Sequence, residues 1–347
     1  MLPFLADTLG SFIGPLRLFG STLFLISFGA AFCCVATFIA LPRLWRLLPT
    51  DQGRAFAVDA DKSIGKPVSA GFIFIPIYVF SVLLVTPLSW PVWLTMGCVL
   101  ALSVIGYFDD RYSFSEATLG FTDLIFALLG AIAVCQLEDF MIWLPLIKES
   151  ITVPAPLFIV GGSGVIWLSI NATNCTDGVD GLAGSLSGLA LVFLGGLLYG
   201  VLGHEVISAY LLVPHYSDGA RWSILAFVMV GSLAGYLWFN SYPSQMLMGD
   251  AGSRPIGFLI GVLVLATGNP FLLVVIAGVL LANGATGLLK VGLLRAFNIR
   301  IFRNVRYPLH DHVRHNLGWS PTQVVMRFLI LQAMITPLIL VLLIKVR

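Results

Sequence analysis

The chain has 347 residues, of which 58% are hydrophobic and only 10% are charged, and its formal net charge is +2. So few charged residues cannot give a folded chain a polar surface, which excludes a soluble globular protein. A helix needs about 20 apolar residues to cross a bilayer, so the chain has room for roughly ten crossings joined by short loops. The sequence therefore predicts an all-α polytopic membrane protein, with residues 1–347 forming a single integral membrane domain.

Two further classes are excluded by the pattern. The apolar runs are continuous and do not alternate every second residue, which favours helices over a membrane barrel. No basic stripe or RNA-binding signature is present, so no nucleic acid partner is expected. The five cysteines lie mostly inside apolar runs, where they are expected to be buried thiols without a disulfide or a metal role.

The predicted crossings begin after an N-terminal segment, residues 1–18, that mixes apolar residues with Asp7 and Arg17 and is typical of the membrane interface. Ten apolar runs then follow, at about 21–41, 69–85, 91–107, 119–135, 157–170, 182–201, 222–239, 256–265, 272–289 and 324–344. Counting the sides that these runs connect predicts that both termini lie on the outer, periplasmic side.

The polar stretches with chemical potential all fall on the other side in this count. They are the expected catalytic loops, at about 42–68, 108–118, 171–181, 240–254 and 290–320. Of the 19 Lys and Arg residues, 13 lie in these stretches. An excess of positive charge next to crossings marks the cytoplasmic side, so the candidate site is expected to face the cytoplasm.

The most polar of these stretches is NATNCTDGVDGLA, residues 171–183, which carries two asparagines and two aspartates within ten residues. Polar clusters are costly in such an apolar chain and mark functional sites, although a plain loop between two helices is the alternative. Asp177 and Asp180 are three residues apart, so on a helical turn they would share a face. They could hold the sugar or base of a nucleotide, or bridge to a metal.

Three further carboxylates stand next to apolar runs. Asp109 and Asp110 directly follow one run, and Asp250 lies between two glycines immediately before another. Mg²⁺ binds to a few carboxylates together with phosphate oxygens of a substrate. We therefore expect Asp250 to be a metal ligand, with Asp110 and Asp177 as further candidates; an ordinary helix start is the alternative for Asp250.

Three of the five histidines lie close together, at His310, His312 and His315, in a stretch that also holds several arginines. Imidazole and guanidinium groups at a membrane surface favour a phosphate-rich ligand. The alternative is a basic patch that contacts anionic lipid head groups. Pro308 restricts the backbone before His310, so His310 is expected to be the best fixed of the three.

Four motifs, in this order, carry a resemblance: FDDRYS, NATNCTDGVDGLA, FNSYPSQMLMGDAGS and PLHDHVRHNLGW. They resemble the polyprenyl-phosphate N-acetylhexosamine-1-phosphate transferases over nearly the whole chain. Within that superfamily, WFNSYPSQMLMGD is most similar to the phospho-N-acetylmuramoyl-pentapeptide transferase (MraY-type) branch. The resemblance implies transfer of phospho-N-acetylmuramoyl-pentapeptide from its UDP-activated form to undecaprenyl phosphate, giving lipid I and UMP with Mg²⁺. It also implies a multi-pass protein of the bacterial inner membrane that serves peptidoglycan synthesis.

The resemblance also implies roles for individual residues. Asp109 would be the base that acts on the lipid phosphate, Asp110 would orient substrate or metal, and Asp250 would hold Mg²⁺. His310 would contact the diphosphate. The expected substrate-binding residues are Asn171, Asn174, Asp177, Gly178, Asp180, Asn240, Ser253, His312 and Lys66. Membrane lipid is an expected partner, and a homodimer is a further hypothesis.

Four positions depart from the family's pattern. They are Ser63 and Ser113, where lysines are expected, Leu247, where an aromatic residue is expected, and Asp311, where a histidine is expected. Lys62 or Lys66 could replace the first lysine. These changes keep open a sister enzyme that transfers N-acetylglucosamine-1-phosphate or a related sugar phosphate. A transporter is a more distant alternative, against which the one-sided clustering of carboxylates speaks.

Overall fold

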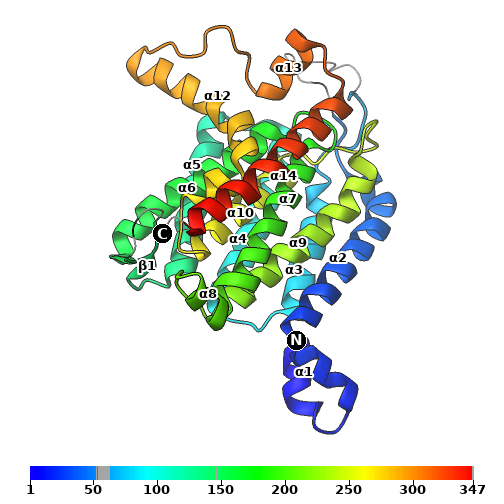
Figure 1. The fold of residues 1–347 in the computed structure, drawn as a ribbon. Coiled ribbons are helices and arrows are strands. Elements are labelled where there is room, and N and C mark those ends of the chain that lie inside the picture. The colour runs from blue at the N-terminus through cyan, green and yellow to red at the C-terminus, as the bar shows by residue number, and fades with distance from the viewer. Residues whose placement is uncertain (52, 54–62, 145–146, 148, 346–347) are drawn as a thin grey trace.

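The computed structural model describes residues 1–51, 53, 63–144, 147 and 149–345. The described residues form a mostly helical bundle, as expected (Figure 1). The helices are α1 (Leu2–Leu9), α2 (Thr22–Leu44), α3 (Gly71–Val85), α4 (Trp90–Tyr112), α5 (Glu116–Cys135), α6 (Ala155–Thr176), α7 (Leu182–Leu197), α8 (Glu205–Tyr210), α9 (Gly219–Asn240), α10 (Asp250–Ala266), α11 (Leu272–Ile276), α12 (Gly278–Phe297), α13 (Leu309–Leu317) and α14 (Pro321–Lys345). The 3₁₀ helices η1 (Gly14–Gly20) and η2 (Trp45–Leu47) lie on either side of α2, and the π-helix η4 (Leu198–Leu202) continues α7.

Within the described residues, eight helices are long and apolar enough to cross a membrane. They are α2 with η2, α4, α5, α6, α7 with η4, α9, α12 and α14. Helices α3 and α10, of 15 and 17 residues, are shorter. Each of the ten predicted apolar runs therefore contains a helix, and eight of these helices are confirmed as candidate membrane spans.

The helices extend beyond the apolar runs, which corrects the predicted loop boundaries. Helix α4 continues to Tyr112 and α6 to Thr176, and α10 already begins at Asp250. Hydropathy marks only the apolar part of a helix, whereas the backbone hydrogen bonds continue into its polar end. The aspartate pair at 109–110 and the asparagines at 171 and 174 therefore lie on helices instead of in loops.

The predicted run 272–289 is also interrupted, because α11 ends at Ile276 and α12 begins two residues later. Gln332 of α14 fills this break. Its Oε1 accepts a hydrogen bond from the Val279 N–H at 2.7 Å, and its Nε2 donates to the Ile276 carbonyl at 2.8 Å. Backbone groups freed inside a membrane protein must find such partners, so α14 fixes the direction in which α12 leaves the bundle.

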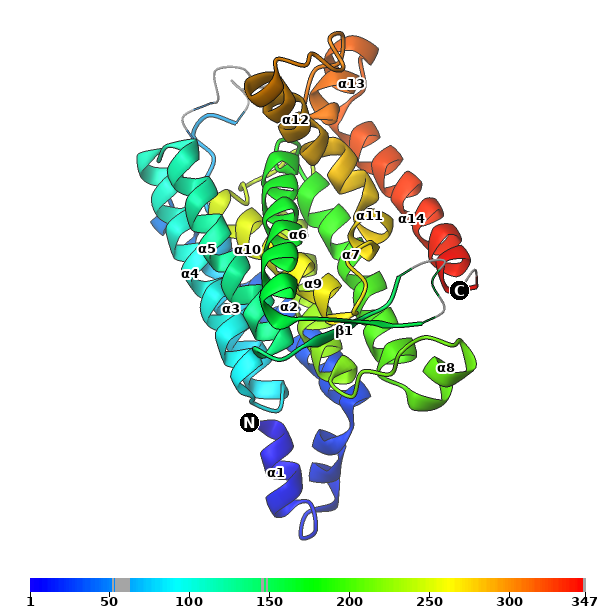
Figure 2. The same ribbon diagram turned by 90° about the vertical axis from the view of Figure 1, so that its left-hand side faces the viewer.

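A small hairpin, absent from the all-α prediction, joins α5 to α6. Strand β1 (Phe140–Ile142) pairs antiparallel with β2 (Ile151–Val153), with Met141 opposite Thr152. The indole Nε1 of Trp143 donates to the Thr267 carbonyl at 2.8 Å and fastens this connection to the end of α10. In Figure 2 the hairpin lies at the opposite end of the bundle from α13, as does the N-terminal helix α1.

Helix α10 is the centre of the bundle, and every one of its residues is buried. Glycines allow neighbouring backbones to approach it closely, as is common between helices in membranes. A Cβ on Gly257 would lie 2.7 Å from Ile170 Cα of α6. A Cβ on Gly71 of α3 would lie 2.1 Å from the Gly252 nitrogen, and one on Gly106 of α4 would lie 2.4 Å from the Ala251 nitrogen. The first turn of α10 is therefore held tightly between α3 and α4.

Candidate active site

The carboxylate of Asp110, in the last turn of α4, caps the N-terminus of α10. Its Oδ1 accepts a hydrogen bond from the Asp250 N–H at 3.0 Å, and its Oδ2 accepts one from the Ala251 N–H at 3.4 Å. Oδ2 also accepts from the Ser69 hydroxyl at 2.6 Å. A carboxylate satisfies the free N–H groups of a helix start and its positive dipole end. Asp110 thus fixes where Asp250 stands.

Gly249 makes this cap sterically feasible. It has a φ of +68°, and a Cβ there would lie only 2.2 Å from Asp110 Oδ2. Gly318 has nearly the same φ, +67°, but faces open space. It is therefore a matched control for the cost of a left-handed alanine.

We expect Gly249→Ala to destabilise the protein more than Gly318→Ala, by the additional loss of the Asp110 cap. A buried group that loses its partners costs about 1–3 kcal/mol. Thermal unfolding of both variants in one detergent measures the difference. Equal melting temperatures would show that the contact between residue 249 and Asp110 contributes nothing.

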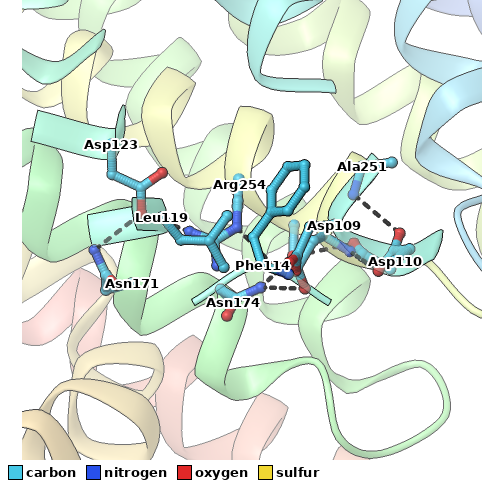
Figure 3. Close-up of polar contacts among 12 residues, drawn as sticks. Asp109, Asp110, Phe114, Leu119, Asp123, Asn171, Asn174, Ala251 and Arg254 are labelled. Carbon is cyan, nitrogen blue, oxygen red and sulfur yellow. Dashed lines mark hydrogen bonds and ion pairs between the residues drawn. The ribbon is translucent and has the colours of Figure 1, made fainter. Parts of the chain in front are cut away.

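The structure brings together the three carboxylates that the sequence singled out, of which Asp109 and Asp110 are labelled in Figure 3. Asp109 Oδ1 accepts a hydrogen bond from the Phe114 N–H at 2.7 Å. The carboxylate of Asp109 is also close enough to that of Asp250 for the two negative charges to repel each other. Asp250 Oδ1 accepts from Asn174 Nδ2 at 2.8 Å, and the same amide nitrogen donates to Ser253 Oγ at 3.1 Å. Helices α4, α6 and α10 therefore contribute to one cluster.

One cation lies inside this cluster. Arg254, one turn after Asp250, donates from Nε to Asp250 Oδ2 at 2.7 Å and from a terminal nitrogen to Asp123 Oδ2 at 2.5 Å. Asp123 comes from the middle of α5 and also accepts from Asn171 Nδ2 at 3.4 Å. Neither Asp123 nor the role of Arg254 was predicted from the sequence. A lone aspartate inside the apolar run 119–135 was the available signal.

A second group of predicted residues ties three loops together. Asp180 Oδ2 accepts from the Ser244 N–H at 2.9 Å and lies 3.8 Å from Lys66 Nζ, which donates to Ser244 Oγ at 3.0 Å. Asn240 accepts from the Gly181 N–H at 2.9 Å and donates to the Met246 carbonyl at 2.8 Å. The side chain of Asn240 is thus occupied by backbone groups that shape the turn after α6.

The turn after α6 corrects one expectation. Asp177 and Asp180 do not share a helical face, because α6 ends at Thr176 and α7 begins at Leu182. The two glycines between these helices, Gly178 and Gly181, interrupt the helical backbone here; Gly181 has a φ of +79°. The backbone of this turn, at Gly178, instead faces His310 in the stretch 290–320.

His310, at the start of α13, packs directly on this turn. A Cβ on Gly178 would lie 2.4 Å from His310 Nε2. Asn283 of α12 holds the histidine from the other side: its Oδ1 accepts from the His310 N–H at 2.8 Å, and its Nδ2 donates to Thr176 Oγ1 at 3.1 Å. His310 Nδ1 lies 3.0 Å from Asn283 Nδ2 and 3.2 Å from Oδ1. At 2% exposure His310 is fixed in place, as Pro308 suggested, and Asn283 is an anchor that the sequence analysis missed.

The other two histidines are less enclosed. His312 Nδ1 accepts a hydrogen bond from the Arg306 N–H at 3.2 Å, so this ring is anchored to the backbone as well. His315 is exposed.

Asp311, between the two histidines His310 and His312, is partly buried. Burial raises the pKa of the Asp311 carboxyl, while the positive charges of Arg306 and Arg314 act against this rise.

Comparison with known proteins decides the family. Residues 92–268, from α4 through α10, match glycosyl transferase family 4. The phospho-N-acetylmuramoyl-pentapeptide-transferase of Treponema pallidum (strain Nichols) is 44% identical over 341 residues, covering 97% of this chain and 94% of that protein. The chain belongs to the phospho-N-acetylmuramoyl-pentapeptide-transferase family. The proteins of the same name from Nautilia profundicola and Neisseria gonorrhoeae are 34% and 30% identical, over 81% and 82% of this chain and 82% and 83% of theirs.

Two of the positions that depart from the pattern of the phospho-N-acetylmuramoyl-pentapeptide-transferase family have structural roles here. The Leu247 N–H donates to the Pro67 carbonyl at 2.8 Å, and its carbonyl accepts from the Ala70 N–H at 3.0 Å. Ser113 ends α4 in a left-handed conformation, with a φ of +56°. Lys62, one substitute for the missing lysine, lies outside the described residues, and Lys66, the other, lies beside Asp180.

The residues present fit a magnesium ion, as the transferase family implies. Among the described residues, no three His, Cys, Asp or Glu side chains are arranged to hold a metal by themselves. Mg²⁺ does not require such a cage, since it keeps waters and uses one or two carboxylates plus substrate phosphates. The charge balance is favourable, because Arg254 is paired with Asp123 and Asp250 and lies near Asp109, while Asp110 bonds to the Asp250 N–H. Among the described residues of this cluster, four carboxylates thus accompany one guanidinium.

Proposed function

We propose that the protein transfers phospho-N-acetylmuramoyl-pentapeptide from its UDP-activated form to undecaprenyl phosphate, giving lipid I and UMP for peptidoglycan synthesis. The observation that carries this proposal is the meeting of Asp109, Asp110 and Asp250 at the first turn of α10, in a chain 44% identical to a transferase of that name over 97% of its length. The contact between His310 and the turn at Gly178 adds a cationic or hydrogen-bonding group at the same end of the bundle.

The reaction needs mainly alignment of the reactants and neutralisation of charge, as phosphoryl transfer does in general. Asp109 takes the proton from the lipid phosphate, whose oxygen attacks the sugar-linked phosphorus while the bond to the UMP oxygen breaks. Asp110 keeps α10 and Asp250 in place, and Asp250 holds the cation. A bound Mg²⁺ supplies positive charge to the phosphate oxygens. His310 donates a hydrogen bond to the diphosphate.

The nucleotide is proposed to bind along the turn after α6. Asp177 and Gly178 would border the nucleotide on one side, and Asp180 and Lys66 on the other. The ion pair between Lys66 and Asp180, and the hydrogen bond from Lys66 to Ser244, support this placement. His312 adds a further basic side chain beside the proposed nucleotide site. The polar groups of Asn171, Asn174, Asn240 and Ser253 line the same region and hold its shape through the hydrogen bonds already described.

We further propose about ten crossings of a bacterial inner membrane, with α3 and α10 added to the eight long helices. Both termini then lie in the periplasm and the site faces the cytoplasm. Two observations support this orientation. The ends of α4, α6 and α9 that carry the motifs lie at the same end of the bundle as α13 (Figure 2), and 13 of the 19 Lys and Arg residues lie in the five predicted catalytic loops.

The homodimer hypothesis is tested separately, by the mass of the protein in detergent micelles.

A panel of UDP-sugars tests the function. Purified protein in detergent, given undecaprenyl phosphate and Mg²⁺, should release UMP with UDP-N-acetylmuramoyl-pentapeptide and not with UDP-N-acetylglucosamine. A chelator should stop the release, and fresh Mg²⁺ should restore it, because the carboxylate cluster needs a cation to receive phosphate.

The other outcomes identify the alternatives. Release with UDP-N-acetylglucosamine alone would favour the sister enzyme, to which the departures at Ser63, Ser113, Leu247 and Asp311 point. No release with any nucleotide would contradict transfer and favour the transporter.

A further inference from the structure

Arg254 divides its guanidinium between two carboxylates that come from different helices. Its Nε lies 2.7 Å from Asp250 Oδ2, and its other bonded nitrogen lies 2.5 Å from Asp123 Oδ2 (Figure 3). Arg254 is 5% exposed and Asp123 is 1% exposed, so water screens neither interaction strongly. The two ion pairs therefore compete for one positive charge.

The carboxylate of Asp123 has little else to bind. Its Oδ1 is buried without a hydrogen-bond partner among the described residues, and its Oδ2 accepts one further, long hydrogen bond from Asn171 at 3.4 Å. A buried carboxylate with so few donors depends on the nearby cation for its stability. Asp123 therefore attracts Arg254 strongly, away from Asp250.

That attraction matters because Asp250 is the proposed ligand of the divalent cation. A guanidinium paired with Asp250 alone would neutralise the charge that the divalent cation needs. We infer that Asp123 is a positioning residue, which holds Arg254 in the shared arrangement and so leaves Asp250 negative enough to bind a divalent cation. This inference rests on the proposed function only in that Asp250 holds the cation.

Direct binding of Mn²⁺ tests the inference without relying on turnover. The full-length protein in detergent is titrated with Mn²⁺, and the electron paramagnetic resonance signal of the free ion gives Kd. We expect Asp123→Asn to weaken Mn²⁺ binding by at least about tenfold, since a unit charge released within a few ångströms acts strongly in a buried site. Asp218→Asn, which breaks an exposed ion pair with Arg221, is the matched control and should leave Kd unchanged.

The double variant separates this role from a merely structural one. Asp123→Asn with Arg254→Gln removes both charges, so Asp250 is no longer neutralised and Kd should return to within about threefold of the wild-type value. If Asp123 only supports packing, the double variant should bind Mn²⁺ as weakly as the single variant or more weakly. The Mg²⁺ concentration for half-maximal rate should follow Kd, while the KM for the nucleotide should change little.

The failures are distinguishable. Wild-type protein that binds no Mn²⁺ would overturn the cation site and this inference together. Binding by the wild type with an unchanged Kd in Asp123→Asn would overturn the inference alone. If Asp123→Asn does not purify as a monodisperse protein, Arg254→Gln replaces it as the test: binding at least about threefold tighter is expected, and unchanged or weaker binding would refute the inference.

Discussion

Asp250→Asn should abolish transfer while the protein stays folded, with a rate at least about 100-fold below the wild type. The variant loses the negative charge that faces Asp109 and would hold Mg²⁺, an ion that prefers carboxylate oxygens to amides. The fold should survive, because it is the backbone N–H of residue 250 that bonds to Asp110. UMP release at saturating Mg²⁺ and the melting temperature in the same detergent measure the two effects.

The control for this prediction is again Asp218→Asn, which removes the same charge at the start of α9, the opposite end of that helix from Asn240, and should keep the wild-type rate. A variant at position 250 that retains more than about a tenth of the rate has lost less than about 1.4 kcal/mol of transition-state stabilisation. Asp250 would then not be the metal ligand.

His310→Ala should reduce the rate by about 100- to 1,000-fold, the usual cost of removing one fixed donor from developing negative charge. His312→Ala should cost about tenfold, because its Nδ1 is used by the Arg306 N–H and its ring is less buried than that of His310. His315→Ala should cost no more than His312→Ala, since that side chain is exposed. UMP release by the three variants, compared at equal expression in one detergent, gives the order.

Gly178→Ala provides independent support without removing the imidazole. Its Cβ would lie 2.4 Å from His310 Nε2, so the ring must move away from the turn. A displacement of about 1 Å at a reacting group can cost about 100-fold in rate. Equal losses at all three histidines, with a normal rate for Gly178→Ala, would instead favour a diffuse basic patch on lipid head groups.

The meeting of the three carboxylates could be predicted because it follows from counting. Asp109 and Asp110 end one apolar run and Asp250 begins another, and the side of the membrane on which each run ends is fixed by the number of crossings before it. His310 could be singled out for a different reason, because Pro308 restricts the chain before it. Both inferences need only local sequence or the order of the runs along it.

The parts that could not be predicted depend on which helices are neighbours. Asp123 is one polar residue inside an apolar run, and its partner Arg254 lies 131 positions away on another helix. In the sequence, Asn283 is a single polar residue within the apolar run that forms α12. Its role follows only from the structure, in which it accepts a hydrogen bond from the His310 N–H of α13. The break between α11 and α12 is stabilised by hydrogen bonds from Gln332 of α14. Hydropathy carries no information about such pairs, since it describes each run by itself.

The helices that hold Asp250 and His310 differ in how much of their surface is buried inside the protein. Every residue of α10 is buried, so the helix that carries Asp250 is enclosed by protein on all sides. Helix α12, which holds His310 through Asn283, has only 22% of its spanning segment buried. Bilayer thickness acts on helices through the surface that they share with lipid, by changing their tilt. A change in bilayer thickness therefore acts more directly on α12, which anchors His310 through Asn283, than on α10, which carries Asp250. The thickness of the membrane, and not only the amino-acid sequence, then influences how His310 is held.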